Sequence, residues 1–144
     1  MHKPLLLDPS RAALACIDLQ EEHRRDRRYL VEAYDAVLAN AARLQQAART
    51  QGAAVLHFAY VVEANPAAMR PLHPKMADGR SAFSSADDPL TAICTEVAPQ
   101  GDEQTVIKAD ASIFSVSGLA DSLRSRGIEW LVVAGVWTEA CIAA

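Results

Sequence analysis

Residues 130–142 read WLVVAGVWTEACI, and this stretch decides the fold that we predict. The apolar run at its start has the length and the β-branched content of a buried strand, and it stops at Gly135. Thr138 follows as a suitable helix N-cap, three residues before Cys141. The sequence therefore predicts a strand that passes directly into a helix, with a thiol in the first turn of that helix.

A cysteine in this position has two interpretations. Exposed backbone N–H groups and the positive end of a helix dipole favour a thiolate, which predicts a low pKa for Cys141. The alternative is that Cys141 is a small buried apolar residue, a common role for a free cysteine. The chain has two other cysteines, Cys16 and Cys94, at no close metal-ligand spacing, and three cysteines cannot all pair. A reducing compartment is the simpler setting.

Composition limits the class of protein. The chain has 144 residues, of which 51% are hydrophobic, which predicts one globular domain over residues 1–144. The net charge of -4, with both signs mixed, argues against a nucleic-acid partner. Since we find no apolar run of the length of a signal peptide or a membrane span, we expect a cytoplasmic enzyme or binding domain without a membrane partner.

The first half of the chain predicts a parallel crossover. Residues 12–17 form a continuous apolar run that ends in the carboxylate of Asp18, as expected for a doubly buried strand. Apolar residues at helical spacing predict a helix over 29–51, and residues 53–60 form a second apolar run. The order strand, helix, strand favours parallel strands with a right-handed connection.

The second half begins with a long segment, 61–104, that has no periodicity, and a loop of this length in a compact domain is usually functional. Within it, residues 88–91 predict a short helical turn. Residues 104–108 then predict a third strand that ends at Lys108, and residues 117–127 predict a helix that leads into the strand at 130–134.

Three parallel strands therefore end at Asp18, at Lys108 and just before Cys141, so an acid, an amine and a thiol meet at one edge of the sheet. A carboxylate beside a thiol can take its proton, and a lysine keeps the carboxylate ionised and stabilises the thiolate. Taken singly, each residue has a structural alternative: a loop cap, a solvated strand end and core filler. Those alternatives are weaker for three residues at equivalent strand ends.

The chain resembles the isochorismatase-like cysteine hydrolases. The resemblance rests on Asp18-Leu19-Gln20 after the first strand, on Val106-Ile107-Lys108, and on Gly135-Val136-Trp137-Thr138-Glu139-Ala140-Cys141. It implies a Rossmann-like, three-layer α/β/α fold with a mostly parallel sheet, a homo-oligomer, and a small-molecule substrate. It also implies that Asp18 is the base, that Lys108 stabilises charge, and that Cys141 attacks an amide or related carbonyl carbon.

Further details of the site follow from the resemblance. It implies a cis peptide bond between Val136 and Trp137, and an oxyanion hole formed by the N–H groups of Trp137 and Cys141. Gln20 belongs to the motif after the first strand and is predicted to bind substrate. Phe83 and Trp137 are candidates for the wall of an apolar pocket. His23 and the two arginines after it could meet a substrate carboxylate, although a solvated position is the simpler interpretation.

The sequence departs from the family in two ways. Nicotinamidases of the superfamily carry an Asp-x-His pair after the second strand, whereas residues 60–66 read YVVEANP, so we predict neither a metal nor another cofactor. Glu63 and His73 are more simply solvated side chains than ligands. Family members also continue well beyond the cysteine, so one sheet edge would be uncovered. We expect the sequence to be a fragment; the alternatives are that another chain supplies the missing cover or that this is a degenerate member.

Three functions remain open from the sequence. The first is a cysteine hydrolase that cleaves the C–N bond of a small non-peptide amide or carbamoyl compound through a thioester at Cys141. The second is an isochorismatase-type hydrolase of a vinyl ether, which can work without the thiol. The third is a non-catalytic oligomerisation or binding domain on the same scaffold.

Overall fold

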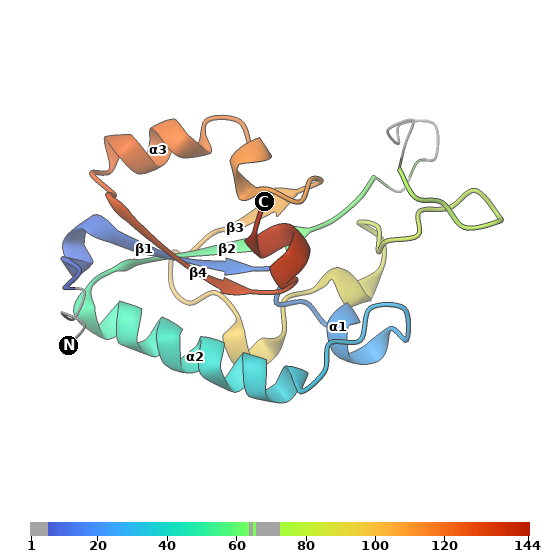
Figure 1. Ribbon diagram of the computed structural model, residues 1–144, viewed down its shortest axis with the longest axis horizontal. Helices are drawn as coiled ribbons and strands as arrows, with labels where there is room; N and C mark the ends of the chain where they lie inside the picture. The colour runs from blue at the N-terminus through green and yellow to red at the C-terminus, as the bar shows by residue number, and fades with distance from the viewer. Residues whose placement is uncertain (1–5, 64, 66–72) are drawn as a thin grey trace.

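Four parallel strands form a single sheet in the computed structural model, which describes residues 6–63, 65 and 73–144 (Figure 1). Their order across the sheet is β3-β2-β1-β4, and all neighbouring pairs in it are parallel. This arrangement confirms the predicted α/β class and its parallel sheet. The strands are β1 (Ala12–Ile17), β2 (Ala54–Tyr60), β3 (Thr105–Lys108) and β4 (Trp130–Gly135).

Strand β1 is the centre of the sheet. It pairs with β2 on one side and β4 on the other, and all six of its residues are buried. Its last residue, Ile17, is in register with Phe58 of β2 and Gly135 of β4. The carboxyl ends of these strands therefore lie at one edge, which is where an open parallel sheet places its chemistry.

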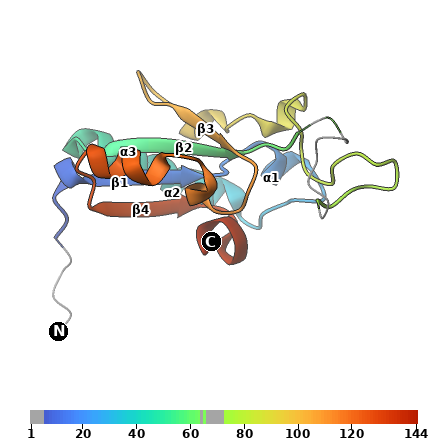
Figure 2. The ribbon, with the colours of Figure 1, turned by 90° about the horizontal axis from the view of Figure 1, so that it is seen from above.

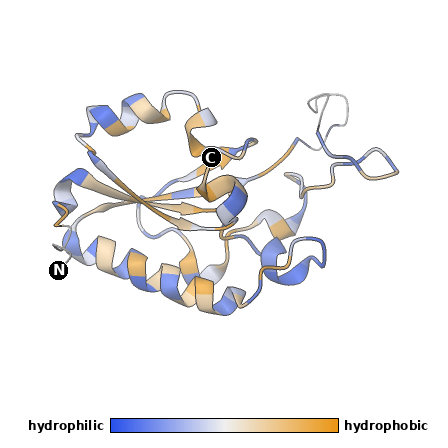
Figure 3. Cartoon of the chain, in the orientation of Figure 1, coloured by the Kyte–Doolittle hydropathy of each residue, from blue (hydrophilic) through white to orange (hydrophobic). Residues whose placement is uncertain are grey.

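Helices cover both faces of the sheet, so the fold has three layers (Figures 1 and 2). The long helix α2 (Tyr34–Gln51) packs on one face, where its Leu38 and Ala41 join a core with Leu14 of β1. Helix α3 (Leu119–Ser125) lies on the other face, where a second core forms around Ile17 and Phe58. Figure 3 shows apolar residues along the strands and at intervals along α2.

The helices differ from the prediction near the start of α2. The predicted helix begins at residue 29, but α2 begins at Tyr34, and Ala33 before it has a left-handed backbone with φ of 52°. Leu30, one of the apolar residues at helical spacing, is 55% exposed. A short helix, α1 (Glu22–Arg25), was not predicted, and the N–H of Val31 closes back onto the carbonyl oxygen of His23. The apolar spacing continues through this turn, which is why the sequence extends the helix too far.

Shorter 3-10 turns connect the remaining elements. One of them, Pro89–Thr91, was predicted, and the side chain of Asp88 accepts a hydrogen bond from the N–H of Leu90 at its start. Residues 64 and 66–72 of the long unpatterned segment lie outside the described residues. The other turns are Pro9–Arg11, Thr95–Val97 and Ile113–Ser115.

Gly135 ends β4 in a conformation that only glycine adopts easily, with φ of 147°. A Cβ atom there would overlap the carbonyl oxygen of Ile17 and lie 2.8 Å from its carbonyl carbon. The two strands can therefore approach this closely only because Gly135 has no side chain. Strand β4 lies at the sheet edge, where Trp130 and Val133 are 41% and 39% exposed.

The segment after β4 differs from the predicted helix. Residues Thr138–Ile142 form a single π-helical turn, and the residue that precedes it is Trp137, which makes no side-chain cap. Thr138 is thus the first residue of the turn, not its N-cap. The peptide bond between Val136 and Trp137 is cis, as the resemblance implies.

Candidate functional site

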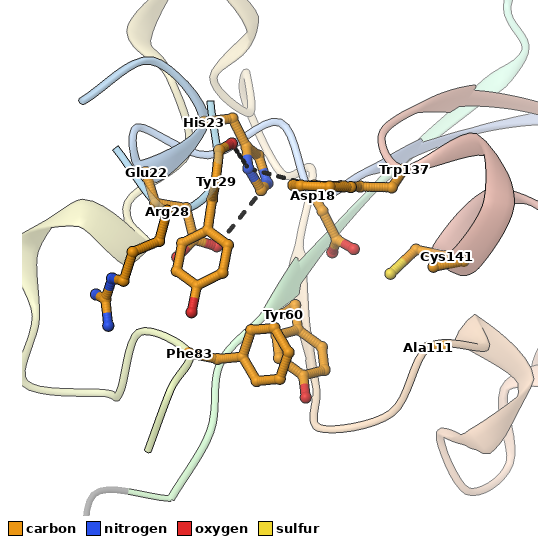
Figure 4. A pocket seen from close by; sticks show the side chains of 11 residues that line it. Asp18, Glu22, His23, Arg28, Tyr29, Tyr60, Phe83, Ala111, Trp137 and Cys141 are labelled. Carbon is orange, nitrogen blue, oxygen red and sulfur yellow. Dashed lines mark hydrogen bonds and ion pairs between the residues drawn. The ribbon is translucent and has the colours of Figure 1, made fainter. Parts of the chain in front are cut away.

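Asp18, Lys108 and Cys141 lie together at the carboxyl edge of the sheet. The Lys108 Nζ atom is 2.9 Å from Asp18 Oδ2 and 3.4 Å from Cys141 Sγ. Asp18 and Lys108 are both only 2% exposed, whereas Cys141 is half-buried. Figure 4 shows the Asp18 carboxylate between Cys141 and the ring of Trp137. An acid, an amine and a thiol are thus in mutual reach.

Each of these side chains is placed by its own element. Asp18 follows β1 with a left-handed backbone, φ 54°, and its N–H donates to the carbonyl oxygen of Phe58. Lys108 ends β3, which is two strands away from β1, and its Nζ atom passes 5.0 Å from the centre of the Tyr60 ring. It also donates to the carbonyl oxygen of Asp110. A long side chain is needed to cover this distance, which suits a lysine.

The electrostatics of the thiol contradict the predicted low pKa. Burial and the adjacent Asp18 carboxylate raise the pKa of Cys141, and Lys108 opposes them only in part. Burial likewise raises the pKa of Asp18, against the attraction of Lys108. Burial thus disfavours the charged form of both groups.

A pocket of about 390 Å³ opens over the thiol. Phe83 and Trp137, the predicted wall residues, both line it. Phe83 stacks on Tyr29 with ring centres 5.6 Å apart and meets Tyr60 edge to face, so one side of the pocket is aromatic. The lining comprises Asp18, Glu22, His23, Arg28, Tyr29, Tyr60, Phe83, Ala111, Trp137, Ala140 and Cys141.

Gln20 has a different position from the one predicted. It is fully buried and does not line the pocket. Its side-chain amide donates to the carbonyl oxygens of Tyr60 and Thr91 and accepts from the N–H of Tyr60. All three bonds go to the backbone, so Gln20 ties the end of β1 to β2 and to the turn at Pro89–Thr91. Its role is to hold the edge that carries Asp18.

Sequence reasoning missed the pocket residue Glu22 and left His23 as a solvated side chain. Both are buried, at 5% and 4% exposure. Burial, with the nearby carboxylate of Asp18 among further causes, raises the pKa of Glu22, and burial lowers the pKa of His23. The two arginines that follow are held elsewhere: Arg24 by Glu21 and Glu96, and Arg25 by Glu21.

The buried carboxyl of Glu22 predicts a stability change that depends on pH. Because its pKa is raised by folding, the folded protein is destabilised as pH rises from the unfolded pKa through the folded one. Glu22→Gln is therefore expected to raise the unfolding temperature at about pH 8 and to give less or no gain at about pH 3. Differential scanning calorimetry measures both, with the exposed Glu32→Gln as control. An equal shift at both pH values would contradict the assignment.

Metal-ligating side chains gather at one place among the described residues, at Glu21, Cys94 and Glu96. Arg24 forms ion pairs with both glutamates, so its guanidinium already compensates their negative charge. Burial raises the pKa of the Cys94 thiol to about 11, which disfavours the thiolate that a metal requires. Glu63 and His73 also have protein partners: Glu63 accepts from the N–H of Asn65, and His73 Nε2 forms a hydrogen bond with Ser81 Oγ.

The parallel sheet, with a pocket at its carboxyl edge, defines a protein of the α/β class. The chain belongs to the isochorismatase family, because the model of the isochorismatase domain matches residues 12–144. Within the described residues, no helix is long and apolar enough to cross a membrane.

Two curated relatives are similar to this chain in sequence. Maleamate amidohydrolase of Pseudomonas putida is 42% identical over 57 residues, which cover 40% of this chain and 27% of that protein. Ureidoacrylate amidohydrolase RutB of Variovorax paradoxus is 30% identical over 97% of this chain and 63% of that protein. This chain thus spans less than two thirds of the length of both relatives.

Solved structures share the fold. A cysteine hydrolase from Pseudomonas syringae superposes with a TM-score of 0.80 at 24% identity, over 98% of this chain and 68% of that one. An isochorismatase family protein from Desulfovibrio vulgaris gives a TM-score of 0.81 at 26% identity, over 92% of this chain and 70% of that one.

Proposed function

We propose that this protein is a cysteine hydrolase that cleaves the C–N bond of a small non-peptide amide or carbamoyl compound. The observation that carries the proposal is the position of Lys108 Nζ, 2.9 Å from Asp18 Oδ2 and 3.4 Å from Cys141 Sγ, below a pocket of small-molecule size. Both curated relatives described above are named as amidohydrolases, which supports amide hydrolysis.

The first half of the proposed reaction forms a thioester. Asp18 takes the thiol proton of Cys141 as sulfur attacks the carbonyl carbon, which gives a tetrahedral oxyanion. The C–N bond then breaks, the nitrogen takes the proton back from Asp18, and ammonia or an amine leaves. The raised pKa values of both groups bring a stronger base to a weaker acid, and Lys108 stabilises whichever partner holds the negative charge.

The second half releases the acid. Asp18 takes a proton from water, the oxygen attacks the thioester carbon, and the C–S bond breaks. The departing sulfur receives the proton held by Asp18, so the protein returns to its starting state. In both halves the N–H groups of Trp137 and Cys141 are proposed to hold the oxyanion, a contribution of roughly 3 kcal/mol for each donor.

Cys141→Ala is the test of this function. The variant is expected to lose ammonia release from a panel of small amides while it keeps its fold, because Cys141 is half-buried and at the pocket surface. Cys94→Ala, outside the pocket, is the control and should keep activity. The acyl-enzyme should be visible by mass spectrometry as a covalent adduct on Cys141. Undiminished hydrolysis by Cys141→Ala would reject the mechanism.

The two alternative functions give different results. A vinyl-ether hydrolase would keep its activity in Cys141→Ala, and a non-catalytic domain would release no product in either form. A homo-oligomer in the cytoplasm also remains a proposal, for which light scattering measures the number of subunits.

A further inference from the structure

Unpaired buried polar atoms concentrate around Glu22. Within the described part of the chain, four buried side-chain atoms have no hydrogen-bond partner: Asp18 Oδ1, Glu22 Oε2, His23 Nε2 and Ser84 Oγ. Most buried polar atoms in proteins are paired, so each exception calls for a partner. Asp18 Oδ1 belongs to the group beside Cys141. The other three are a second set, which the proposed chemistry does not use.

Glu22 is central to this second set. Its Oε1 atom is 3.8 Å from His23 Nε2. The Ser84 side chain lies close enough to the carboxyl to lower the pKa that burial raises, although the contact lacks the geometry of a hydrogen bond. Glu22 and His23 both line the pocket of Cys141. Figure 4 shows Glu22 beyond Tyr29 and His23, on the side of the pocket away from Cys141. A pocket ligand attached at Cys141 would therefore extend toward Glu22.

The charges around Glu22 select the kind of group that it can meet. Asp18, Asp26 and Asp88 all act on the carboxyl as negative charges. Arg28 is the arginine of the pocket lining, and Asp26 holds its Nε and Nη2 atoms while Nη1 donates to the carbonyl oxygen of Ala82. The guanidinium is thus already engaged, and a ligand carboxylate at this end would face negative charge.

We propose that Glu22 is a substrate-binding residue that accepts a hydrogen bond from an N–H group at the far end of the substrate. The substrate class is then a small amide that carries a second amide or amine group, and a substrate with a carboxylate in that place is rejected. The ionised carboxyl of Glu22 accepts a hydrogen bond from an N–H group and repels a ligand carboxylate. The inference rests on the proposed function, in which Cys141 attacks the first amide.

Matched pairs of substrates test the inference. Succinamide and succinamate differ only in whether the far group is an amide or a carboxylate, and malonamide and malonamate offer the same comparison at shorter length. Wild-type protein is expected to hydrolyse the better diamide with kcat/KM at least roughly tenfold above that of the matched carboxylate, as measured by ammonia release. A preference for the carboxylate in both pairs would overturn the proposal.

Glu22→Gln separates a binding contact from general pocket shape. The glutamine keeps an acceptor oxygen, adds an N–H donor and removes the negative charge, so the relative rate on the carboxylate should rise. Glu32→Gln, exposed and outside the pocket, should leave the ratio unchanged. An unchanged ratio in Glu22→Gln would contradict the assignment, and circular dichroism confirms that the variants are folded.

A binding measurement keeps this test independent of catalysis. In the Cys141→Ala background, calorimetry with succinamide and succinamate, and with the malonic pair, reports affinity without turnover. The role of Glu22 would be supported if the diamide binds more tightly than the carboxylate and Glu22→Gln abolishes that preference. This holds even if wild-type protein releases no ammonia and the proposed hydrolysis fails. Equal binding, tighter binding of the carboxylate, or no binding of any of the four compounds would overturn it.

Discussion

Replacement of Asp18 by Asn is expected to slow hydrolysis roughly a thousandfold, because the thiol loses the base that takes its proton. The substitution is conservative in shape, and Asn tolerates the left-handed backbone of this position, φ 54°, as well as Asp does. The loss should therefore appear in kcat without loss of the fold, as checked by steady-state ammonia release and circular dichroism.

The same variant should make Cys141 more reactive toward iodoacetamide near neutral pH. The Asp18 carboxylate raises the pKa of the thiol, so its removal lowers that pKa and increases the thiolate fraction below it. The pH profile of alkylation thus moves to lower pH while hydrolysis is lost. Cys16 and Cys94 are buried and serve as internal controls that should label slowly in both proteins. Slower alkylation of Cys141 in Asp18→Asn would contradict this account.

Gly135→Ala is expected to have the largest effect on stability, a loss of roughly 4 kcal/mol in the free energy of unfolding, or failure to fold. The new Cβ would overlap the carbonyl group of Ile17, and φ of 147° is strained for alanine. Strands β1 and β4 would separate at the end that carries the site. Urea denaturation measures the loss.

Gly101→Ala is the matched control for this substitution. Gly101 also has a positive φ, 60°, but a Cβ there would meet nothing within 4 Å. Its replacement should cost only about 1 kcal/mol, from the backbone strain alone. Equal losses in the two variants would mean that close strand contact does not explain the need for Gly135.

The arrangement of the sheet was readable from the sequence because it depends on local patterns. Apolar runs that end at Asp18 and Lys108 identify parallel strands, and parallel strands share a carboxyl edge. The meeting of these two groups with Cys141 follows from topology. The start of α2 could not be predicted from the sequence, because Leu30 continues the helical spacing while the chain there turns back onto His23.

The environment of each site residue was beyond sequence reasoning, because it depends on distant segments. The pKa of Cys141 is set by burial and by a carboxylate that is far away in the chain. Gln20 forms part of a motif, but its three backbone partners lie 40 and 71 residues further along, so its role as a tie could not be seen. The pocket position of Glu22 likewise depends on the loop that brings Phe83 to the same wall.

The central place of β1 has a consequence for biosynthesis. Synthesis runs from the N-terminus, so β1, β2 and β3 leave the ribosome before β4, and these three strands are neighbours in the sheet. Asp18 and Lys108 can therefore pair while the thiol is still attached to an undocked segment. Cys141 meets its proposed base only when β4 adds to the free side of β1, so the group of three side chains is complete only after that strand has docked.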